Sequence, residues 1–248
     1  MQKMTNSFKI FAVVLLALSL TREAQARKGG AKALKNGSIA IGFGVSLMSA
    51  NQDGLNDMIK AAKTAQPGVT TSELSSAMEY NAQFTFRFSN GLVAVQLRPS
   101  YFTQSSMGSG PTGDFDYKLT GFSLFPLVRL IPLSNDIIDF YIQGGLGYGE
   151  LKGDITNGAG NNLSFKGSGF GLQIGLGADF CVTANSCFGV EGNYRYLPIS
   201  RNIVNSTSGT ISGTTQTTPN KELEGLDGND VGTSMSGVGG TLSYTFNF

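Results

Sequence analysis

The sequence predicts an all-β fold: a closed antiparallel transmembrane β-barrel of about eight strands, with short periplasmic turns and long extracellular loops. Three observations lead to this prediction. The chain begins with an export leader, apolar and polar residues alternate with a period of two in about eight segments, and the connections between segments are short and long in turn. A period of two predicts strands with one apolar and one polar face.

Residues 1–26 predict a signal peptide that is cleaved. Lys3 and Lys9 make its start basic, residues 10–20 are apolar, and Ala24-Gln25-Ala26 has the small-x-small pattern of a cleavage site. The apolar run is shorter than the roughly 20 residues that a transmembrane helix needs. We therefore expect an exported protein.

The mature chain is nearly neutral. Without the leader it has 15 basic and 16 acidic residues, a net charge of −1. This balance does not provide the basic surface that nucleic-acid binding requires, so we expect no nucleic-acid partner. The length suits one domain. We expect a basic periplasmic lead-in over residues 27–37 and the barrel domain over residues 38–248.

The alternation is clearest in the last segment, 238–248. Its apolar face carries Val238, Leu242, Tyr244, Phe246 and Phe248. The other runs begin near Ile39, Tyr80, Val93, Tyr117, Phe140, Phe170 and Phe188. Each is close to the ~9–11 residues that a tilted strand needs to cross the hydrocarbon. The run within 117–130 is the least regular, since both faces are apolar after Gly121, and we expect either a bulge there or a register that the pattern does not fix.

The connections support a membrane barrel over a soluble sandwich. The short ones are 89–91, 131–138 and 181–187. The longer polar ones are 49–77, 103–116, 152–163 and 199–234. Short periplasmic turns and long external loops are typical of bacterial outer-membrane barrels, whereas a sandwich has no reason to keep this alternation. Strands in lipid must close on themselves, because each backbone amide needs a partner.

The chain resembles the small outer-membrane β-barrel domain proteins of the OmpA and OmpX type. The residues that carry the resemblance are 140–149, FYIQGGLGYG, and the alternation that ends on Phe248. The resemblance implies a place in the bacterial outer membrane, with lipid and lipopolysaccharide as surroundings. It also implies insertion by the barrel assembly machinery, which recognises a terminal aromatic strand (Tyr244, Phe246, Phe248). We find no peptidoglycan-binding domain after the barrel, so a wall-tethering role is not implied.

The sequence contains no histidine. A triad with a histidine base and metal ligation by histidine are therefore excluded. Membrane-embedded lipid A acyltransferases and deacylases have a similar architecture but depend on a histidine, so this chain cannot share their mechanism. We expect no enzyme activity, no cofactor and no metal site.

Ionisable residues on the predicted inner faces are the main candidates for a site. They are Glu79, Arg87, Arg98, Asp179, Glu191 and Arg195, joined by Lys118 if the fourth strand has the expected register. Unpaired charges in a narrow lumen cost several kcal/mol, so these must pair or be wet. Two interpretations stay open: a network that plugs the barrel, or a lining for a narrow solute path. Inward glycines either make room for large neighbours such as Arg98 and Arg195 or leave a passage.

Cys181 and Cys187 flank the third short turn. The periplasm is oxidising, and an even number of cysteines in an exported chain favours a disulfide. Because one cysteine ends a strand and the other begins the next, the sequence predicts a bond across this hairpin.

Tyrosines near the strand ends predict an interfacial girdle. They are Tyr80, Tyr101, Tyr148, Tyr194, Tyr196 and Tyr244. Loop 49–77 has Leu55, Met58, Ile59 and Ala62 at helical spacing, which predicts a short amphipathic helix over the barrel mouth or on the lipid surface. Loop 199–234 is rich in Ser, Thr, Asn and Gly, and we expect it to have little to bury and to be mobile. These two loops are the places where an extracellular ligand would bind.

The functional prediction is a monomeric barrel with a structural or surface-interaction role, in adhesion or envelope integrity. The alternative is a narrow porin-like channel for ions or small solutes. A hydrophobic-ligand uptake barrel ranks below both, because it requires an apolar lumen and the inner faces of the second, third and seventh strands are polar.

Overall fold

The computed structural model describes residues 38–89, 91–135, 137–158, 160–183 and 185–248. The predicted leader and lead-in, residues 1–37, lie outside the described residues. No helix in the described part of the chain is both long and apolar enough to cross a bilayer.

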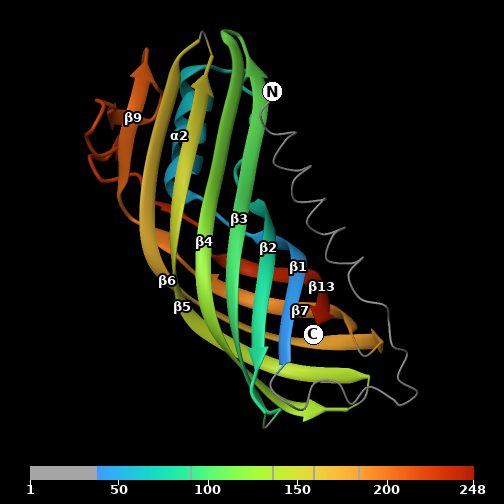
Figure 1. Cartoon of the computed structure of the whole chain (residues 1–248). Helices are drawn as coiled ribbons and strands as arrows, with labels where there is room; N and C mark the ends of the chain where they lie inside the picture. Colours follow the sequence, from blue (N-terminus) through green and yellow to red (C-terminus); the bar gives the residue numbers. More distant parts are fainter. Residues whose placement is uncertain (1–37, 90, 136, 159, 184) are drawn as a thin grey trace, which may run out of the picture. The chain divides into compact units, whose positions relative to one another are not determined.

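Eight strands form one antiparallel ring, which confirms the predicted fold class (Figure 1). The strands are β1 (Ser38–Ser49), β2 (Ser76–Arg87), β3 (Val93–Gly110), β4 (Gly113–Ser134), β5 (Ile138–Asn157), β6 (Asn162–Thr183), β7 (Ser186–Tyr196) and β13 (Gly237–Asn247). Each pairs with the next along the chain, and β13 pairs with β1 from Ala40↔Asn247 to Ser49↔Val238. The pairing therefore runs around the whole ring.

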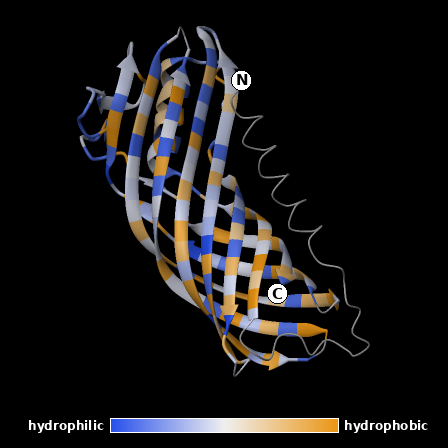
Figure 2. Ribbon diagram, in the orientation of Figure 1, coloured by the Kyte–Doolittle hydropathy of each residue, from blue (hydrophilic) through white to orange (hydrophobic). Residues whose placement is uncertain are grey.

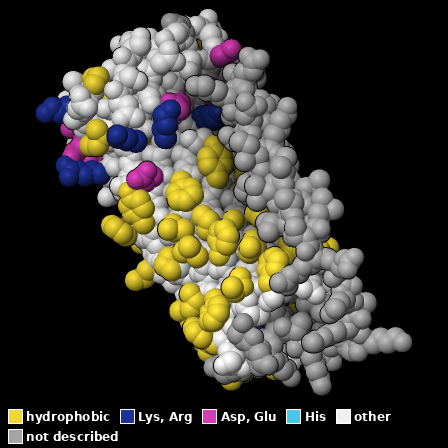
Figure 3. All heavy atoms as spheres, in the orientation of Figure 1, with side chains coloured by type: hydrophobic (Ala, Val, Ile, Leu, Met, Phe, Trp, Pro, Cys, Tyr) yellow, Lys and Arg dark blue, Asp and Glu magenta, His cyan; other side chains and the backbone are white. Residues whose placement is uncertain are grey.

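Side chains alternate between the lumen and the outer surface. Figure 2 shows hydrophobic and hydrophilic residues alternating along the strands, and Figure 3 shows apolar side chains gathered in a band with the charged ones beyond it. The band includes Phe84, Leu97, Ile142 and Leu242, all exposed. Exposed apolar side chains in these numbers require lipid around them. The predicted girdle tyrosines all lie on this outer surface.

Strands β3 to β6 are much longer than a membrane crossing requires. They have 18, 22, 20 and 22 residues, about twice the ~9–11 of a crossing strand. Their far halves form an extension beyond the ring, where residues 111–112 connect β3 to β4 and residues 158–161 connect β5 to β6. The expectation of long loops at 103–116 and 152–163 is therefore wrong. Those stretches look polar because their outward side chains face water.

Both lateral edges of this extension are covered. Strand β9 (Asn202–Ser208) pairs with β6 along one edge. Along the other edge, the Thr70 amide donates to the Ser109 carbonyl over 2.9 Å, and the Ser106 hydroxyl donates to the Ser72 carbonyl over 2.5 Å. Unpaired strand edges invite pairing with other chains, so the connection before β2 acts as a cover for β3.

The inside of the extension holds an apolar core built around helix α2 (Asp53–Ala65). The predicted helix is confirmed, and Leu55, Met58, Ile59 and Ala62 are buried. They lie within the core and not on a lipid surface. The strands contribute Phe102, Phe115, Tyr117, Leu119, Phe125, Leu127, Leu151, Ile155, Leu163 and Phe165. This explains why both faces of β4 are apolar: one faces lipid and the other faces the core.

The long connection between β7 and β13 is folded, so the expectation that 199–234 has little to bury is wrong. It contains β8 (Pro198–Ile199), β9, β10 (Thr214–Gln216), β11 (Glu224–Gly225) and β12 (Thr233–Ser234). Leu223 and Met235 are fully buried in the core. The side-chain amide of Gln52, before α2, donates to the Ser234 carbonyl over 2.6 Å and joins the two connections. Few apolar residues suffice here because the strands supply the rest of the core.

Candidate functional site

Within the membrane section, four arginines pair with four carboxylates inside the lumen. The pairs are Arg87–Asp139, Arg129–Asp179, Arg98–Glu191 and Arg195–Glu79. All six residues predicted for the lumen are among them. Lys118 is not, because the inward residues of β4 are odd-numbered and Lys118 is exposed on the outer face. Each pair connects strands that are not neighbours in the ring.

The centre of the network is the pair of Arg98 on β3 and Glu191 on β7. Nη1 and Nη2 of Arg98 donate to the two carboxylate oxygens of Glu191, each over 2.7 Å. The Glu191 carboxylate also accepts from the Gln143 amide over 2.8 Å and from the Tyr141 hydroxyl over 3.1 Å. Both charged side chains are almost fully buried. A bidentate arginine with further donors satisfies a buried carboxylate well.

The next layer toward the short turns centres on Arg129 of β4. Its Nη1 lies 3.0 Å from Oδ2 of Asp179, its Nε donates to Gln143 over 3.1 Å, and its guanidinium stacks 3.6 Å above the Tyr141 ring. Gln143 and Tyr141 thus contact both this layer and Glu191. The layers form one continuous network rather than isolated pairs.

The network ends at the short-turn side, the periplasmic end, with Arg87 and Asp139. Arg87 lies 2.7 Å from Asp139 and donates to the Gly91 carbonyl of the first turn over 2.9 and 2.7 Å. A cavity of about 40 Å³ lies beside it. Oδ1 of Asp139 and Nη2 of Arg129 have no hydrogen-bond partner among the described residues. The cavity is polar and large enough for water to reach them.

The layer toward the extracellular side joins Arg195 of β7 to Glu79 of β2. Arg195 also donates to the Met235 carbonyl over 2.6 Å and lies 3.2 Å from the Met48 sulfur. Met235 belongs to the apolar core, so the polar network continues directly into it. The lumen below this level holds the four ion pairs, and the interior above it is mainly apolar. The expectation of a polar inner face therefore holds for the membrane section alone.

Glycines accommodate rings in this interior. A Cβ on Gly177 would lie 2.5 Å from the Tyr141 hydroxyl and 2.6 Å from its ring, and a Cβ on Gly147 would overlap the Phe125 ring. These inward glycines therefore make room for large neighbours. The neighbours are aromatic rings, not the Arg98 and Arg195 that the sequence suggested.

Two other predicted features have clear positions. Cys181 and Cys187 form a disulfide across the β6–β7 turn, which confirms the prediction. Tyr244 and Phe246 lie on the outer face of β13, with their rings 4.7 Å apart, and Phe248 follows the strand. A role for these three in assembly stays a prediction.

Arg129 and Asp139 were missed by sequence reasoning. Asp139 lies one residue before the outward Phe140, so the parity of β5 was enough to place it. Placing Arg129 in the lumen required the register of β4, which could not be read from the sequence because both faces of this strand are apolar. The bulge expected within 117–130 is absent, since β4 keeps one register with β3 and one with β5 over these residues. The register shifts only after them, between Leu130 and Leu133 opposite β5.

The chain is similar to known outer-membrane proteins. The model of the outer membrane protein beta-barrel domain matches residues 10–220. The structure resembles OprG from Pseudomonas aeruginosa, with 16% identity, a TM-score of 0.52, and coverage of 86% of this chain and 97% of that one. It also resembles a major outer membrane protein from Thermus thermophilus, with 11% identity, a TM-score of 0.51, and coverage of 86% and 99%. None of the curated proteins compared with the chain matches it.

The two solved structures agree with this one in fold, at identities that show the fold alone. The family match covers most of the chain. The ring of strands, the outward apolar band and the family match all agree. The chain belongs to the outer membrane protein β-barrel domain family, and its location is the bacterial outer membrane.

Proposed function

We propose that this protein is a plugged barrel with a structural and surface-interaction role, which anchors a folded extracellular unit in the outer membrane. The unit consists of the extension of β3 to β6, α2, and the connection 197–236. On this proposal the strands inside the membrane hold the unit in place, and its exposed face contacts partners or neighbouring envelope components.

One observation carries the proposal: the network of four arginines and four carboxylates crosses the lumen at successive levels and continues into the apolar core. The interior of an eight-stranded barrel is just wide enough for side chains to fill it. A conducting path would have to separate Arg98 from Glu191, which lie 2.7 Å apart and are nearly fully buried. Separating a buried pair costs several kcal/mol.

Two alternative functions considered from the sequence, a narrow channel and a hydrophobic-ligand uptake barrel, fit the structure less well. A narrow channel needs a continuous wet path, whereas the central layer is closed by bidentate hydrogen bonds. Uptake of a hydrophobic ligand needs space inside the apolar section. There the side chains of α2, such as Met58 and Ile59, pack against the strands.

Conductance of the refolded protein in a planar bilayer tests the proposal. We expect no discrete openings from wild-type protein that shows a heat-modifiable gel shift, which reports folding. Arg98→Gln/Glu191→Gln removes both charges, leaves polar side chains across the central layer and is expected to remain silent as well. Reproducible openings of the wild type, with a unitary conductance that changes in this double variant, would refute the plug and support the channel.

The role in the envelope is tested in cells. Deletion of the gene is expected to increase sensitivity to detergent, or to abolish a surface-binding phenotype, and the wild-type gene is expected to restore it. Replacing residues 206–220 of the extracellular connection by a short Gly-Ser linker keeps the membrane ring. If this variant folds and restores both phenotypes fully, the proposed role of the extracellular unit is wrong.

A further inference from the structure

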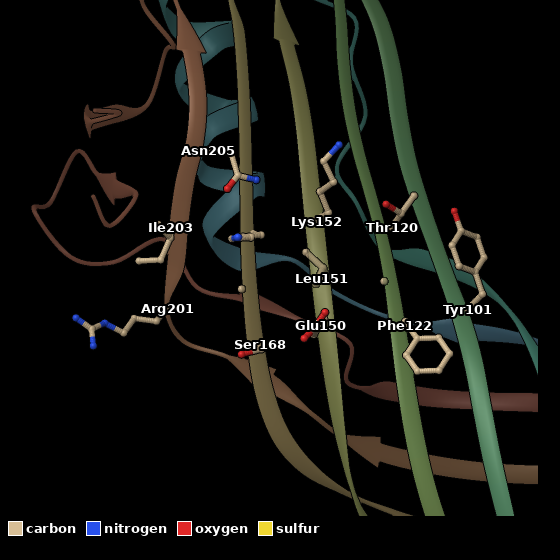
Figure 4. Close-up of a pocket in the computed structure, with 13 residues that line it drawn as sticks. Tyr101, Thr120, Phe122, Glu150, Leu151, Lys152, Ser168, Arg201, Ile203 and Asn205 are labelled. Atoms are coloured by element: carbon tan, nitrogen blue, oxygen red, sulfur yellow. The ribbon is translucent and has the colours of Figure 1, made fainter. Parts of the chain in front are cut away.

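The outer face of the extension carries a groove of about 840 Å³. Figure 4 shows its lining, which runs from Tyr101 on β3 across β4, β5 and β6 to Asn205 on β9 and Arg201 just before it. The charged side chains of β5 and β6 that line the groove point away from the core, because Glu150, Lys152 and Lys166 alternate with the core residues Leu151 and Phe165. Its charged residues are Glu150, Lys152, Lys166 and Arg201.

The groove lies directly above the apolar band. Tyr148 of β5 is paired in register with Phe170 of β6, the next outward pair is Glu150 with Ser168, and the next is Lys152 with Lys166. Each step is two residues, so the lysines are about 13 Å along the strands from the aromatic pair. Aromatic residues mark the edge of the hydrocarbon. The two ammonium groups are therefore at the height of lipid headgroups.

Lys152 and Lys166 face each other directly across the β5–β6 pair. Like charges at such positions are destabilising. Lys152 has a partner on its own strand, Asp154, at 3.0 Å. Lys166 has no ion pair within 4.0 Å among the described residues. An anion bound between the two lysines would turn this repulsion into attraction.

The remaining charges do not block such an anion. Arg201, at the β9 side of the groove, is paired with Glu222. The carboxylate of Glu150, one step closer to the membrane, accepts from the Tyr148 hydroxyl over 2.9 Å. It is thus held toward the aromatic edge, away from the row of the two lysines.

We propose that this groove binds the phosphate group of a phosphorylated glycolipid of the outer leaflet. Lys152 and Lys166 contact the phosphate, and the hydroxyl and amide groups of Thr120, Ser168 and Asn205 face the sugar. The acyl chains lie along the apolar band below, beside Phe122 and Phe170. A membrane lipid fits better than a soluble anion, because the lining changes from charged to aromatic in the direction of the hydrocarbon. This site does not depend on whether the lumen conducts.

Titration with lipid A tests the proposal. The full barrel, refolded in detergent micelles, is titrated with bisphosphorylated lipid A, and the bound lipid is counted by native mass spectrometry. Each lysine near a phosphate surface is worth ~1 kcal/mol, so Lys152→Gln/Lys166→Gln is expected to weaken binding roughly thirtyfold. Lys152→Arg/Lys166→Arg is expected to retain binding, because arginine keeps the charge and also binds phosphate.

Matched controls separate the groove from charge in general. Lys63→Gln/Lys221→Gln removes the same charge from exposed positions outside the groove and is expected to bind like the wild type. The gel shift verifies that every variant folds. Equal binding by the Lys152→Gln/Lys166→Gln variant overturns the proposal, and so does equal binding of lipid A without its phosphates. If inorganic phosphate or a sulfated polysaccharide displaces lipid A at matched concentration, the site recognises a soluble anion and the lipid is rejected.

Discussion

Arg98 of β3 and Glu191 of β7 lie on opposite sides of the ring, four strands apart in either direction. Their bidentate contact therefore spans the full width of the lumen. Hydrogen bonds between neighbouring strands hold each pair together. A contact between opposite strands stabilises the circular closure itself. The other three pairs also connect strands that are not neighbours, so the whole network stabilises the closed ring from inside.

Removing one partner of this pair should strongly destabilise the barrel. Glu191→Gln leaves the buried charge of Arg98 without a carboxylate, which is expected to cost about 3–5 kcal/mol in the free energy of unfolding. Urea titration monitored by the gel shift measures it. Arg98→Met/Glu191→Leu removes both charges and is expected to cost much less. Asp57→Asn, in an exposed pair with Lys60, is the control and should change stability by less than about 1 kcal/mol.

Gly177 on β6 and Gly192 on β7 differ in the space around them. A Cβ on Gly177 would overlap the Tyr141 ring, whereas a Cβ on Gly192 meets nothing within 4 Å. Gly177→Ala is expected to displace Tyr141, lose its hydrogen bond to Glu191 and destabilise the barrel by about 1–3 kcal/mol. Gly192→Ala should be close to neutral in the same urea titration. If Gly177→Ala proves as close to neutral as Gly192→Ala, the lumen around Tyr141 is loosely packed.

The disulfide should have a modest effect on stability. It closes a loop with a sequence separation of 6, for which the chain-entropy estimate is about 2 kcal/mol. Cys181→Ser/Cys187→Ser is therefore expected to fold and insert, with a lower urea midpoint. Mass spectrometry after alkylation without reductant provides the complementary measurement. Incorporation of two alkyl groups into the native protein would mean that the bond does not form in the cell.

The extracellular core should open without loss of the membrane ring. Ile59→Ala removes a fully buried side chain from α2 and is expected to cost about 2–5 kcal/mol of local packing. Limited proteolysis should then cleave connections 50–75 and 197–236 faster, while the gel shift of the barrel remains. Lys63→Ala, at an exposed position on the same helix, is the control. Loss of the gel shift in Ile59→Ala alone would indicate that core and ring fold as one unit.

Much of the membrane section could be predicted from the sequence, because lipid outside and polar groups inside impose a strict period of two. That period is enough to place Arg98, Glu191 and Arg195 on the lumen side. The pairing of Arg98 with Glu191 could not be predicted, since it depends on which strands face each other across the ring. The register of β4 could not be predicted from its hydropathy. Phe125 and Leu127 face an apolar core and Leu124 faces lipid, so apolar residues lie on both faces of this strand.

The extracellular unit was the harder part for a similar reason. Residues 103–116 and 152–163 continue the strands with outward Ser, Asp and Lys side chains that face water. Their composition is therefore similar to that of a loop. The core residues within 199–234, such as Leu223 and Val231, are few and widely separated, so the composition of this segment is still that of a loop. The groove was also not predictable, because it requires the alignment of Lys152 with Lys166 on two different strands.

The covered edges of the extension have a consequence for life in a crowded membrane. Outer-membrane barrels stand side by side, and a sheet that rises above the lipid with bare backbone on its flanks would join the sheets of its neighbours. With β9 on one flank and the Thr70–Ser72 stretch on the other, this sheet has its flanking hydrogen bonds occupied. We therefore expect that copies of this protein in one membrane do not join edge to edge through this sheet.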